Sequence, residues 1–377
     1  MSQHTFFAMC ARGLEPVLHE EVKGLRLGKV ERQTGGVRFQ GSRADGQRAN
    51  LWLRTAGRVL MRLDRFPSAS SDSLYSGIGR IPWEKWLAPE GTLRVDAQTS
   101  DSALDHSRFI EQRVKDAICD RFREQSGARP SVSGEDADLR VHVHLFRDRA
   151  TVSLDSSGAP LRKRGWRTTS GRAPLAETLA AGMVLASGWQ GRAPLIDPFC
   201  GSGTILVEGG LIATHTAPGL ARDCFGFERW LDHDARAFEK LRDTARASQR
   251  PVGKLRLVGA DKDEDQVAEA RANLVAAGLG EAAQVEAGDA RSFAPKRGWN
   301  ANVVSNLPYG KRVGSDANMV QLHRDFAARL RSECAGYSAT LLTAAGPLAK
   351  ALDLPGAKRA PLANGGLECE RVIAHLE

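Results

Sequence analysis

A short apolar run followed by an acidic, glycine-containing loop most strongly constrains the fold of this chain. The run covers residues 195–196, and Asp197 ends it. Glycines follow at 201 and 203, and an apolar helical run covers 205–212. In open α/β sheets such a loop lets the backbone approach a ligand at the carboxyl ends of the strands. The feature predicts a ligand-binding α/β domain.

The residues after about 173 alternate between strand-like and helix-like segments. Strands are predicted at 195–196, 255–259, 283–285, 301–304 and 338–342, with a helix at 263–277 among the intervening segments. This alternation predicts a doubly wound, mostly parallel sheet. The loop lacks the third glycine of a dinucleotide fingerprint, because Leu206 occupies that position. NAD-type binding is therefore disfavoured.

The N-terminal half reads as two smaller α/β units, covering residues 1–65 and 66–155. In the first, helices are predicted at 13–25 and 50–63 and a strand at 37–39. In the second, residues 92–97 resemble a strand, and apolar residues between 109 and 122 recur at helical spacing. The alternating runs at 139–146 and 150–154 predict two strands, on which His142 and His144 face solvent rather than a metal.

Positive charge is concentrated in the N-terminal half. Residues 1–170 contain 28 Lys and Arg against 21 Asp and Glu, whereas the remainder contains 25 against 24. Five cations and no acid lie between 156 and 176, around Trp166. A module that binds an anionic polymer has this composition. We expect the segment 156–172 to be a hinge that contacts RNA; its alternative is a solvated linker.

Two acidic positions after later strands suit a nucleoside. Asp261 follows the strand predicted at 255–259, and a carboxylate there can accept both ribose hydroxyls; Asp263 is the alternative. Asp289 follows the next strand, where it can accept a hydrogen bond from an adenine amino group. Cys200, within the glycine loop, is interpreted as a small packing residue rather than a nucleophile.

The segment Asn306, Leu307, Pro308, Tyr309 and Gly310 suits the chemistry of an exocyclic amine. The Asn306 side-chain oxygen and the Leu307 carbonyl can accept the two amine hydrogens and orient the nitrogen lone pair. Pro308 would fix the turn, and Tyr309 would stack on an extracted base. The segment resembles the [D/N]-P-P-[Y/F] motif of amine-methylating enzymes, with Leu307 where many relatives have proline.

The loop at 197–204 resembles the cofactor loop of amino-group methyltransferases, and nearly the whole chain is similar to one family. That family is the bacterial THUMP-domain RNA methyltransferases that make N2-methylguanosine in large-subunit ribosomal RNA. The similar segments are 11–14, 35–39, 50–60, 154–158, 163–167, 173–181, 217–220 and 225–230. The last two resemble an insert of the ribosomal group, which favours ribosomal over transfer RNA.

The resemblance implies a ferredoxin-like unit at 1–65, a THUMP domain at 66–155, a basic linker at 156–172 and a Rossmann-like class I methyltransferase domain at 173–377. Its cofactor is S-adenosyl-L-methionine. The residues expected to bind it are Thr178, Asp197, Pro198, Phe199, Cys200, Gly201, Ser202, Gly203, Thr204, Asp261, Lys262, Gly288, Asp289, Ala290 and Asn306. Those expected to contact RNA are Arg162, Lys163, Arg164, Trp166, Arg167 and Arg172. With one cofactor loop, the chain corresponds to the guanine-N2 half of relatives that carry two methyltransferase domains.

Three alternatives stay open at this point: the same chemistry on transfer RNA, adenine-N6 methylation of DNA, and a non-catalytic RNA-binding assembly factor. The six cysteines lie at 10, 119, 200, 224, 334 and 369, without the spacing of a zinc site. No apolar run is long enough to span a bilayer. We expect a monomeric, cytosolic protein that binds structured RNA and no metal.

Overall fold

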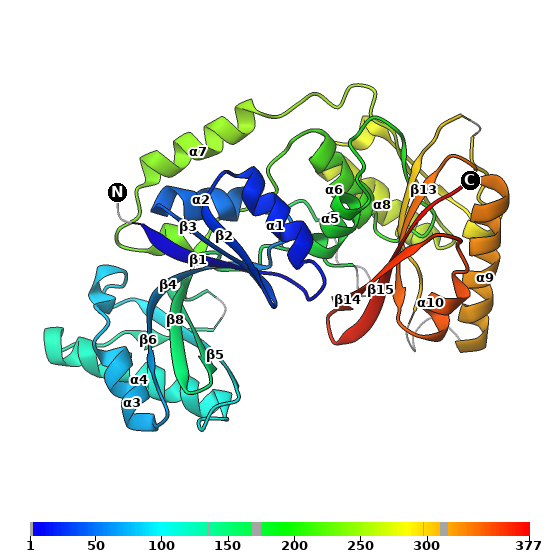
Figure 1. The fold of residues 1–377 in the computed structure, drawn as a ribbon. Coiled ribbons are helices and arrows are strands. Elements are labelled where there is room, and N and C mark those ends of the chain that lie inside the picture. Colours follow the sequence, from blue (N-terminus) through cyan, green and yellow to red (C-terminus); the bar gives the residue numbers. More distant parts are fainter. Residues whose placement is uncertain (1–2, 135, 168–174, 297, 310–315) are drawn as a thin grey trace.

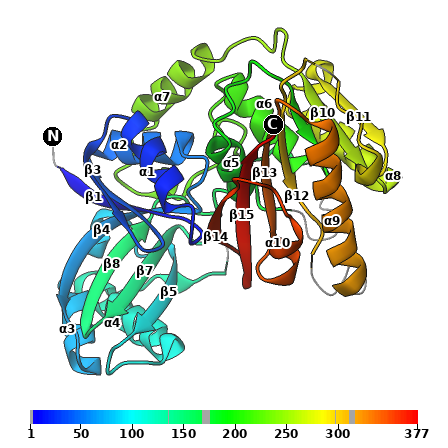
Figure 2. The ribbon, with the colours of Figure 1, turned by 45° about the vertical axis from the view of Figure 1, so that its right-hand side comes forward.

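Two β-sheets organise the computed structural model, which describes residues 3–134, 136–167, 175–296, 298–309 and 316–377. Figures 1 and 2 show the N-terminal sheet beside the C-terminal one, with the β14–β15 hairpin lying between the main bodies. The first sheet has eight strands in the order β2-β3-β1-β4-β8-β7-β5-β6. The second has seven in the order β11-β10-β9-β12-β13-β15-β14.

The N-terminal unit has the predicted ferredoxin-like arrangement of strands and helices. Its elements are β1 (His4–Met9), α1 (Glu15–Gly24), β2 (Gly28–Gln33), β3 (Gly36–Gly41), α2 (Arg43–Trp52) and β4 (Arg58–Pro67). The second unit contributes α3 (Ser71–Gly79), η1 (Trp83–Lys85), β5 (Thr92–Ser100), α4 (Ser107–Ser126), β6 (Ser131–Val132), β7 (Leu139–Phe146) and β8 (Arg149–Asp155). Because β4 pairs with both β1 and β8, one continuous sheet joins the two units.

The helix predicted at 50–63 is wrong. Helix α2 begins after Ser42, whose side chain caps it together with Asp45, and it ends at Trp52. The following residues form β4 instead, in which Val59, Leu60 and Met61 are all buried. Three consecutive apolar residues suit a central strand with little exposure on either face, but their spacing alone also allows a buried helix.

The C-terminal half confirms the predicted doubly wound, mostly parallel sheet. Its elements are α5 (Glu177–Ala186), β9 (Leu195–Asp197), α6 (Thr204–Ala213), η2 (Gly226–Arg229), α7 (Ala235–Ala247), β10 (Leu257–Asp261), α8 (Glu264–Ala276), η3 (Gly280–Ala282), β11 (Ala283–Ala287), η4 (Ala290–Ser292), β12 (Asn302–Asn306), α9 (Asp316–Glu333), β13 (Ser338–Ala344), α10 (Pro347–Ala351), β14 (Lys358–Asn364) and β15 (Leu367–His375). Strands β9 to β13 are parallel, and the hairpin β14–β15 adds antiparallel pairing to β13. One apolar core lies under α5, α6 and α8, and another lies under α9 and includes Leu352 and Leu354, which follow α10.

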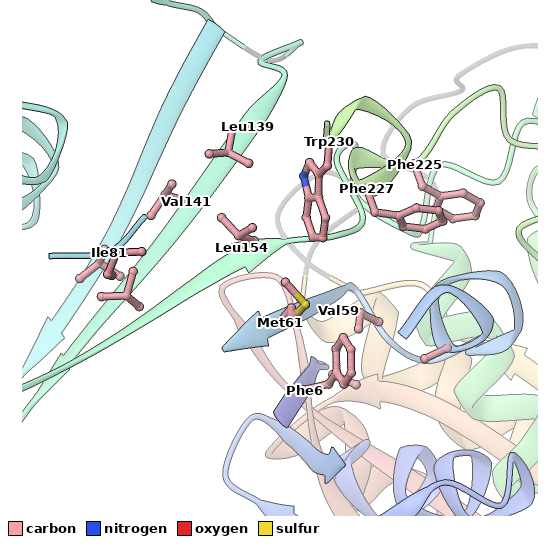
Figure 3. Close-up of a cluster of buried hydrophobic side chains, with 14 of the residues drawn as sticks. Phe6, Val59, Met61, Ile81, Leu139, Val141, Leu154, Phe225, Phe227 and Trp230 are labelled. Carbon is pink, nitrogen blue, oxygen red and sulfur yellow. The ribbon is translucent and has the colours of Figure 1, made fainter. Parts of the chain in front are cut away.

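The segment between α6 and β10 leaves the second sheet and packs into the N-terminal core. Phe225, Phe227 and Trp230 belong to the same buried cluster as Phe6 and Met61 of the first sheet. Figure 3 shows these rings beside Val59 and Leu154. The Gly219 amide also donates a backbone hydrogen bond to the Leu51 carbonyl at 3.0 Å. The two halves therefore share one core through this insert. No helix in the described part of the chain is long and apolar enough to cross a membrane.

Candidate active site

The glycine loop between β9 and α6 has the backbone that its sequence predicts. Gly201 and Gly203 have φ values of 49° and 78°, in the left-handed region that disfavours other residues. A Cβ on Gly203 would lie 3.0 Å from Cβ of Ala270 in α8, so close packing requires this glycine. Among the described residues, a Cβ on Gly201 would meet only Gln266 Oε1 within 4 Å, at 3.6 Å. The Gly201 side of the loop is therefore open to a ligand.

Asp197 joins the loop to the strand that carries the predicted catalytic motif. Its carboxylate is buried and accepts hydrogen bonds from the Ser305 hydroxyl at 2.5 Å and from the Phe199 amide at 3.2 Å. Burial raises the pKa of Asp197 to about 7, although the Ser305 hydrogen bond opposes this shift. The sequence did not predict this role for Ser305, because the hydrogen-bond partner of a serine inside a strand cannot be inferred until the neighbouring strand is known.

The carboxyl ends of neighbouring strands bring the nucleoside candidates together. Asp261 accepts hydrogen bonds from the amides of Gly201 at 2.9 Å and Asp263 at 3.0 Å. Its own carbonyl accepts from the Gly288 amide at 2.9 Å. The Asp263 side chain caps α8 by accepting from the Asp265 amide. This geometry favours Asp261 over Asp263 as the ribose ligand.

Several other predicted cofactor residues follow the carboxyl ends of the same strands. Asp289 accepts hydrogen bonds from the amide and the guanidinium of Arg291, so an adenine amino group would have to share its oxygens. Lys262 is exposed and Ala290 is buried. Phe199, which follows Pro198, packs edge-to-face on Phe326 of α9 with ring centroids 5.0 Å apart.

Cys200 is buried against the sheet. Its Sγ would lie 3.2 Å from a Cβ on Gly259, so the thiol fills the space that this glycine leaves. Burial raises the pKa of the Cys200 thiol well above its ordinary value. Both observations fit the expected packing role and leave no thiolate for nucleophilic chemistry.

The predicted catalytic motif lies at the end of β12. Asn306 Oδ1 is buried, and within the described ranges it has no hydrogen-bond partner. Leu307 is fully buried and its amide donates to the Leu342 carbonyl at 2.9 Å. The Tyr309 hydroxyl accepts a hydrogen bond of 2.6 Å from Asn364 of the β14–β15 hairpin, a contact that sequence reasoning missed. Pro308 is half-buried, and Gly310 lies outside the described residues.

The basic linker differs from the expected RNA-contacting hinge. Arg164 is 3% exposed and donates to Glu208 Oε1 at 3.1 Å and to the carbonyls of Leu161 and Arg54. Trp166 is buried in the core under α5 and α6. A buried side chain cannot reach a phosphate, so we withdraw Arg164 and Trp166 as RNA contacts.

The other predicted linker contacts divide between two environments. Arg162 and Lys163 are exposed, and Arg172 lies outside the described residues. Arg167 points inward: its guanidinium donates to Glu177 at 2.9 Å, to Ser202 at 3.1 Å and to Thr204 at 3.0 Å. It ties the linker to the start of α5, beside Thr178, and to Ser202 and Thr204, the residues on either side of Gly203. Arg167 is thus a support of the loop rather than an RNA contact.

These residues fit S-adenosylmethionine better than they fit a metal. The open side of Gly201, the carboxylate of Asp261 and Asn306 Oδ1, for which the described residues supply no partner, lie at one edge of the sheet, where α/β folds bind nucleosides. A buried amide oxygen without a partner costs free energy, so its presence indicates a donor that arrives with a ligand. Across the described residues, no group of three or more His, Cys, Asp or Glu side chains could hold a metal ion.

Three family models match consecutive parts of the chain. A ferredoxin-like domain model of the RlmL type matches residues 5–60, and a THUMP domain model matches 68–155. The model described as RMKL-like, methyltransferase domain, matches residues 164–373, more than half of the chain. The chain belongs to the RMKL-like methyltransferase family. Its combination of domains confirms the predicted fold class.

Curated relatives of this RMKL-like methyltransferase carry one recurrent name. A protein of Methylococcus capsulatus named ribosomal RNA large subunit methyltransferase K/L is 41% identical over 371 residues, covering 97% of this chain. One of the same name from Psychromonas ingrahamii is 37% identical over 369 residues. The chain spans about half the length of these relatives, 50% and 49% respectively.

Solved structures share the whole architecture. A methyltransferase crystallised with S-adenosylhomocysteine, SMU.472, has a TM-score of 0.89 at 28% identity, with 100% of this chain and 99% of that chain covered. A Listeria monocytogenes protein, described as a predicted N6-adenine-specific DNA methylase, also has a TM-score of 0.89 at 28% identity, with 100% of this chain and 97% of that chain covered. This RMKL-like methyltransferase and these two solved proteins therefore share the whole arrangement at 28% sequence identity.

Proposed function

We propose that this protein transfers a methyl group from S-adenosylmethionine to the exocyclic N2 amine of a guanosine in structured RNA, with 23S ribosomal RNA as the substrate. The observation that carries the proposal is Asn306 Oδ1, a buried hydrogen-bond acceptor without a partner among the described residues, at the sheet edge that holds the glycine loop. The names of the curated relatives support ribosomal RNA as the target.

The chemistry assigns distinct tasks to the residues of the site. S-adenosylmethionine supplies an electrophilic methyl group. Asn306 Oδ1 and the Leu307 carbonyl accept the two hydrogens of the guanine amine, which directs its lone pair and stabilises the developing positive charge. The Tyr309 ring, anchored through its hydroxyl to Asn364, stacks on the extracted base. Asp261 binds the cofactor ribose, and Asp289 binds its adenine.

The division of labour in the chain forms part of the same proposal. Residues 1–65 and 66–155 grip the RNA, 156–172 connect, and 173–377 bind the cofactor and catalyse transfer. The boundary at 65 falls inside β4, so the first two units act as one body. Monomeric state and cytosolic location belong to this proposal as predictions.

The test identifies the product nucleoside. The purified chain is incubated with labelled S-adenosylmethionine and unmodified 23S ribosomal RNA, a transfer RNA transcript or duplex DNA. Digestion followed by chromatography should give N2-methylguanosine from ribosomal RNA, and the Asn306→Ala variant should give little. N6-methyladenine from DNA would instead establish the activity named for the Listeria neighbour. Label in transfer RNA alone would overturn the ribosomal assignment.

A further inference from the structure

The N-terminal sheet has two different faces. Met61 and Leu154 are paired across β4 and β8 and are buried in the core that the helices cover. The next pair along these strands, Arg62 and Ser153, points the opposite way, because side chains alternate across a sheet. We call this second side, formed by β3, β1, β4, β8, β7 and β5, the open face. Among the described elements, α1 to α4 all pack on the other side, through residues of one shared core.

Three arginines of the open face lie close enough for their charges to interact, and among the described residues only one of them, Arg38, forms an ion pair. Arg62 is half-buried, and burial lowers its pKa, as do the charges of Arg38 and Arg65. Arg38 has a carboxylate partner, Glu31. Arg62 Nε is buried and, within the part of the chain described, has no hydrogen-bond partner. Like charges this close repel each other, so an anion bound at Arg62 would relieve the repulsion.

The acids nearer the middle of the open face are already neutralised. Asp96 accepts from Arg94 at 3.0 Å and also pairs with Arg140, and Asp155 pairs with Arg58. These carboxylates therefore do not repel an approaching phosphate chain. Because these acids are paired, the additional arginines give the open face a net positive charge where the strands of the two units meet.

Aromatic rings extend the same face along β7. His142 pairs with Ser153, which places it two strands from Arg62 in the same row, about 10 Å away. The rings of His144 and Phe146 lie parallel, 6° apart, with centroids separated by 6.3 Å. Phe146 is 39% exposed, an unusual position for a large aromatic ring.

The histidines on this row act as flat rings rather than as cations. Burial lowers the pKa of His142 to about 4 and also lowers the pKa of His144. Both are therefore neutral at pH 7. Arg147 extends the platform, since its guanidinium lies 5.0 Å from the centre of the Phe146 ring.

We propose that the open face holds a single-stranded RNA segment, with a phosphate at Arg62 and bases stacked on His144 and Phe146. Cations that follow the backbone beside stacking rings are how proteins bind single strands without reading a sequence. In Figures 1 and 2, β5 lies on the side of the sheet nearer to β14 and β15, which hold Asn364 beside Tyr309. The open face would therefore hold the stretch of RNA that adjoins the target base. This inference rests on the proposed RNA substrate.

The test uses variants that differ in which side of the sheet they alter. Phe146→Ala removes an exposed ring from the open face, whereas Phe109→Ala removes a comparably exposed ring from α4, on the covered side. Binding of a labelled single-stranded RNA is measured by anisotropy. Phe146→Ala should weaken it by roughly 10-fold or more, as the loss of a stacked base does. Phe109→Ala should leave it unchanged.

The cation cluster is tested through the salt dependence of the same affinity. Arg62→Gln should reduce the slope of log affinity against log salt by about 0.7, the value for one phosphate contact on a single strand. Arg108→Gln, an exposed position on α4, serves as the control. Calorimetric affinity for S-adenosylhomocysteine should be unchanged in all variants, which shows that they are folded.

Photo-crosslinking of the wild-type chain provides a check that needs no substitution. Crosslinks should map to residues 140–149, and crosslinks confined to α3 or α4 would overturn the proposal. Equal affinity for a hairpin duplex, undiminished by Phe146→Ala, would indicate recognition of duplex shape instead and would also overturn it. If product analysis shows N2-methylguanosine while the open-face variants bind normally, the proposed function stands and this inference alone fails.

Discussion

The hydroxyl of Ser305 donates a hydrogen bond of 2.5 Å to Oδ1 of Asp197. One residue belongs to the strand that leads to Asn306, and the other ends the strand that leads to the glycine loop. Both are buried, so this bond is shielded from water and fixes the two strand ends against each other. This bond therefore adds to the β9–β12 pairing in setting the positions of the proposed methyl donor and acceptor.

Asp197 should make the stability of the protein depend on pH. Its folded pKa of about 7 exceeds the ordinary value of 3.8, so the folded state keeps a proton that the unfolded state has lost. The free energy of unfolding should therefore fall as pH rises from about 4 to about 7 and should change little from this group above that. Urea titrations of Asp197→Asn across this range should show a smaller decrease than wild type. Parallel curves would show that Asp197 is ionised throughout.

Gly201→Val should abolish cofactor binding. A valine would place its side chain on the open side of the loop, at a φ of 49° that β-branched residues avoid. Calorimetry with S-adenosylhomocysteine measures the loss. Gly127→Val is the matched control, since this glycine also has a positive φ and open surroundings but caps α4. A folded Gly201→Val protein that binds with wild-type affinity would move the cofactor elsewhere.

Asn306→Ala should lower turnover by roughly 100- to 1000-fold while sparing cofactor affinity, because it removes one preorganised acceptor from the reacting amine. Tyr309→Ala should also reduce turnover, through loss of base stacking. Asn302→Ala, at the other end of β12, should have little effect. Single-turnover methylation of RNA under saturating cofactor separates these outcomes. Turnover near wild type in both site variants would relocate the catalytic centre.

Arg164→Ala should destabilise the fold by about 3 kcal/mol, because it leaves the buried Glu208 carboxylate without its hydrogen-bonded partner. The neighbouring exposed Arg162→Ala should change the free energy of unfolding by less than about 0.5 kcal/mol. Denaturant titration measures both. The double variant Arg164→Met, Glu208→Gln should recover part of the loss, since it removes the buried Glu208 charge together with its Arg164 partner. Equal, small effects for Arg164 and Arg162 would restore the solvated-linker interpretation.

The fold of the catalytic half could be predicted because the sequence patterns that indicate it are local. The strand, the glycine turn and the helix from Asp197 to Ala213 are adjacent in sequence, and each restricts the others. The positions of Asp261 and Asn306 after later strand-like runs predict their roles in the same way. What local patterns do not contain is the partner of a side chain. Ser305 and Asn364 acquire their roles only from strands that are distant in sequence.

The linker shows the limit of reading function from charge. Arg164 and Arg167 look alike in sequence to the exposed Arg162, but acids from α5 and α6 lie beside them in the fold. A cluster of arginines predicts anion binding only when the acids that could pair with them are known to be elsewhere. The terminal hairpin β14–β15 was likewise not predicted.

The insert that carries Phe225, Phe227 and Trp230 has a consequence for co-translational folding. The N-terminal core contains these rings, yet they are synthesised after the whole first sheet and after α6. The first sheet must therefore emerge with part of its interior unfilled, and it cannot close until about residue 245 has left the exit tunnel. Nascent chains shorter than this should expose apolar surface and recruit chaperones. If the two halves are expressed separately, each should be insoluble rather than fold as an independent domain.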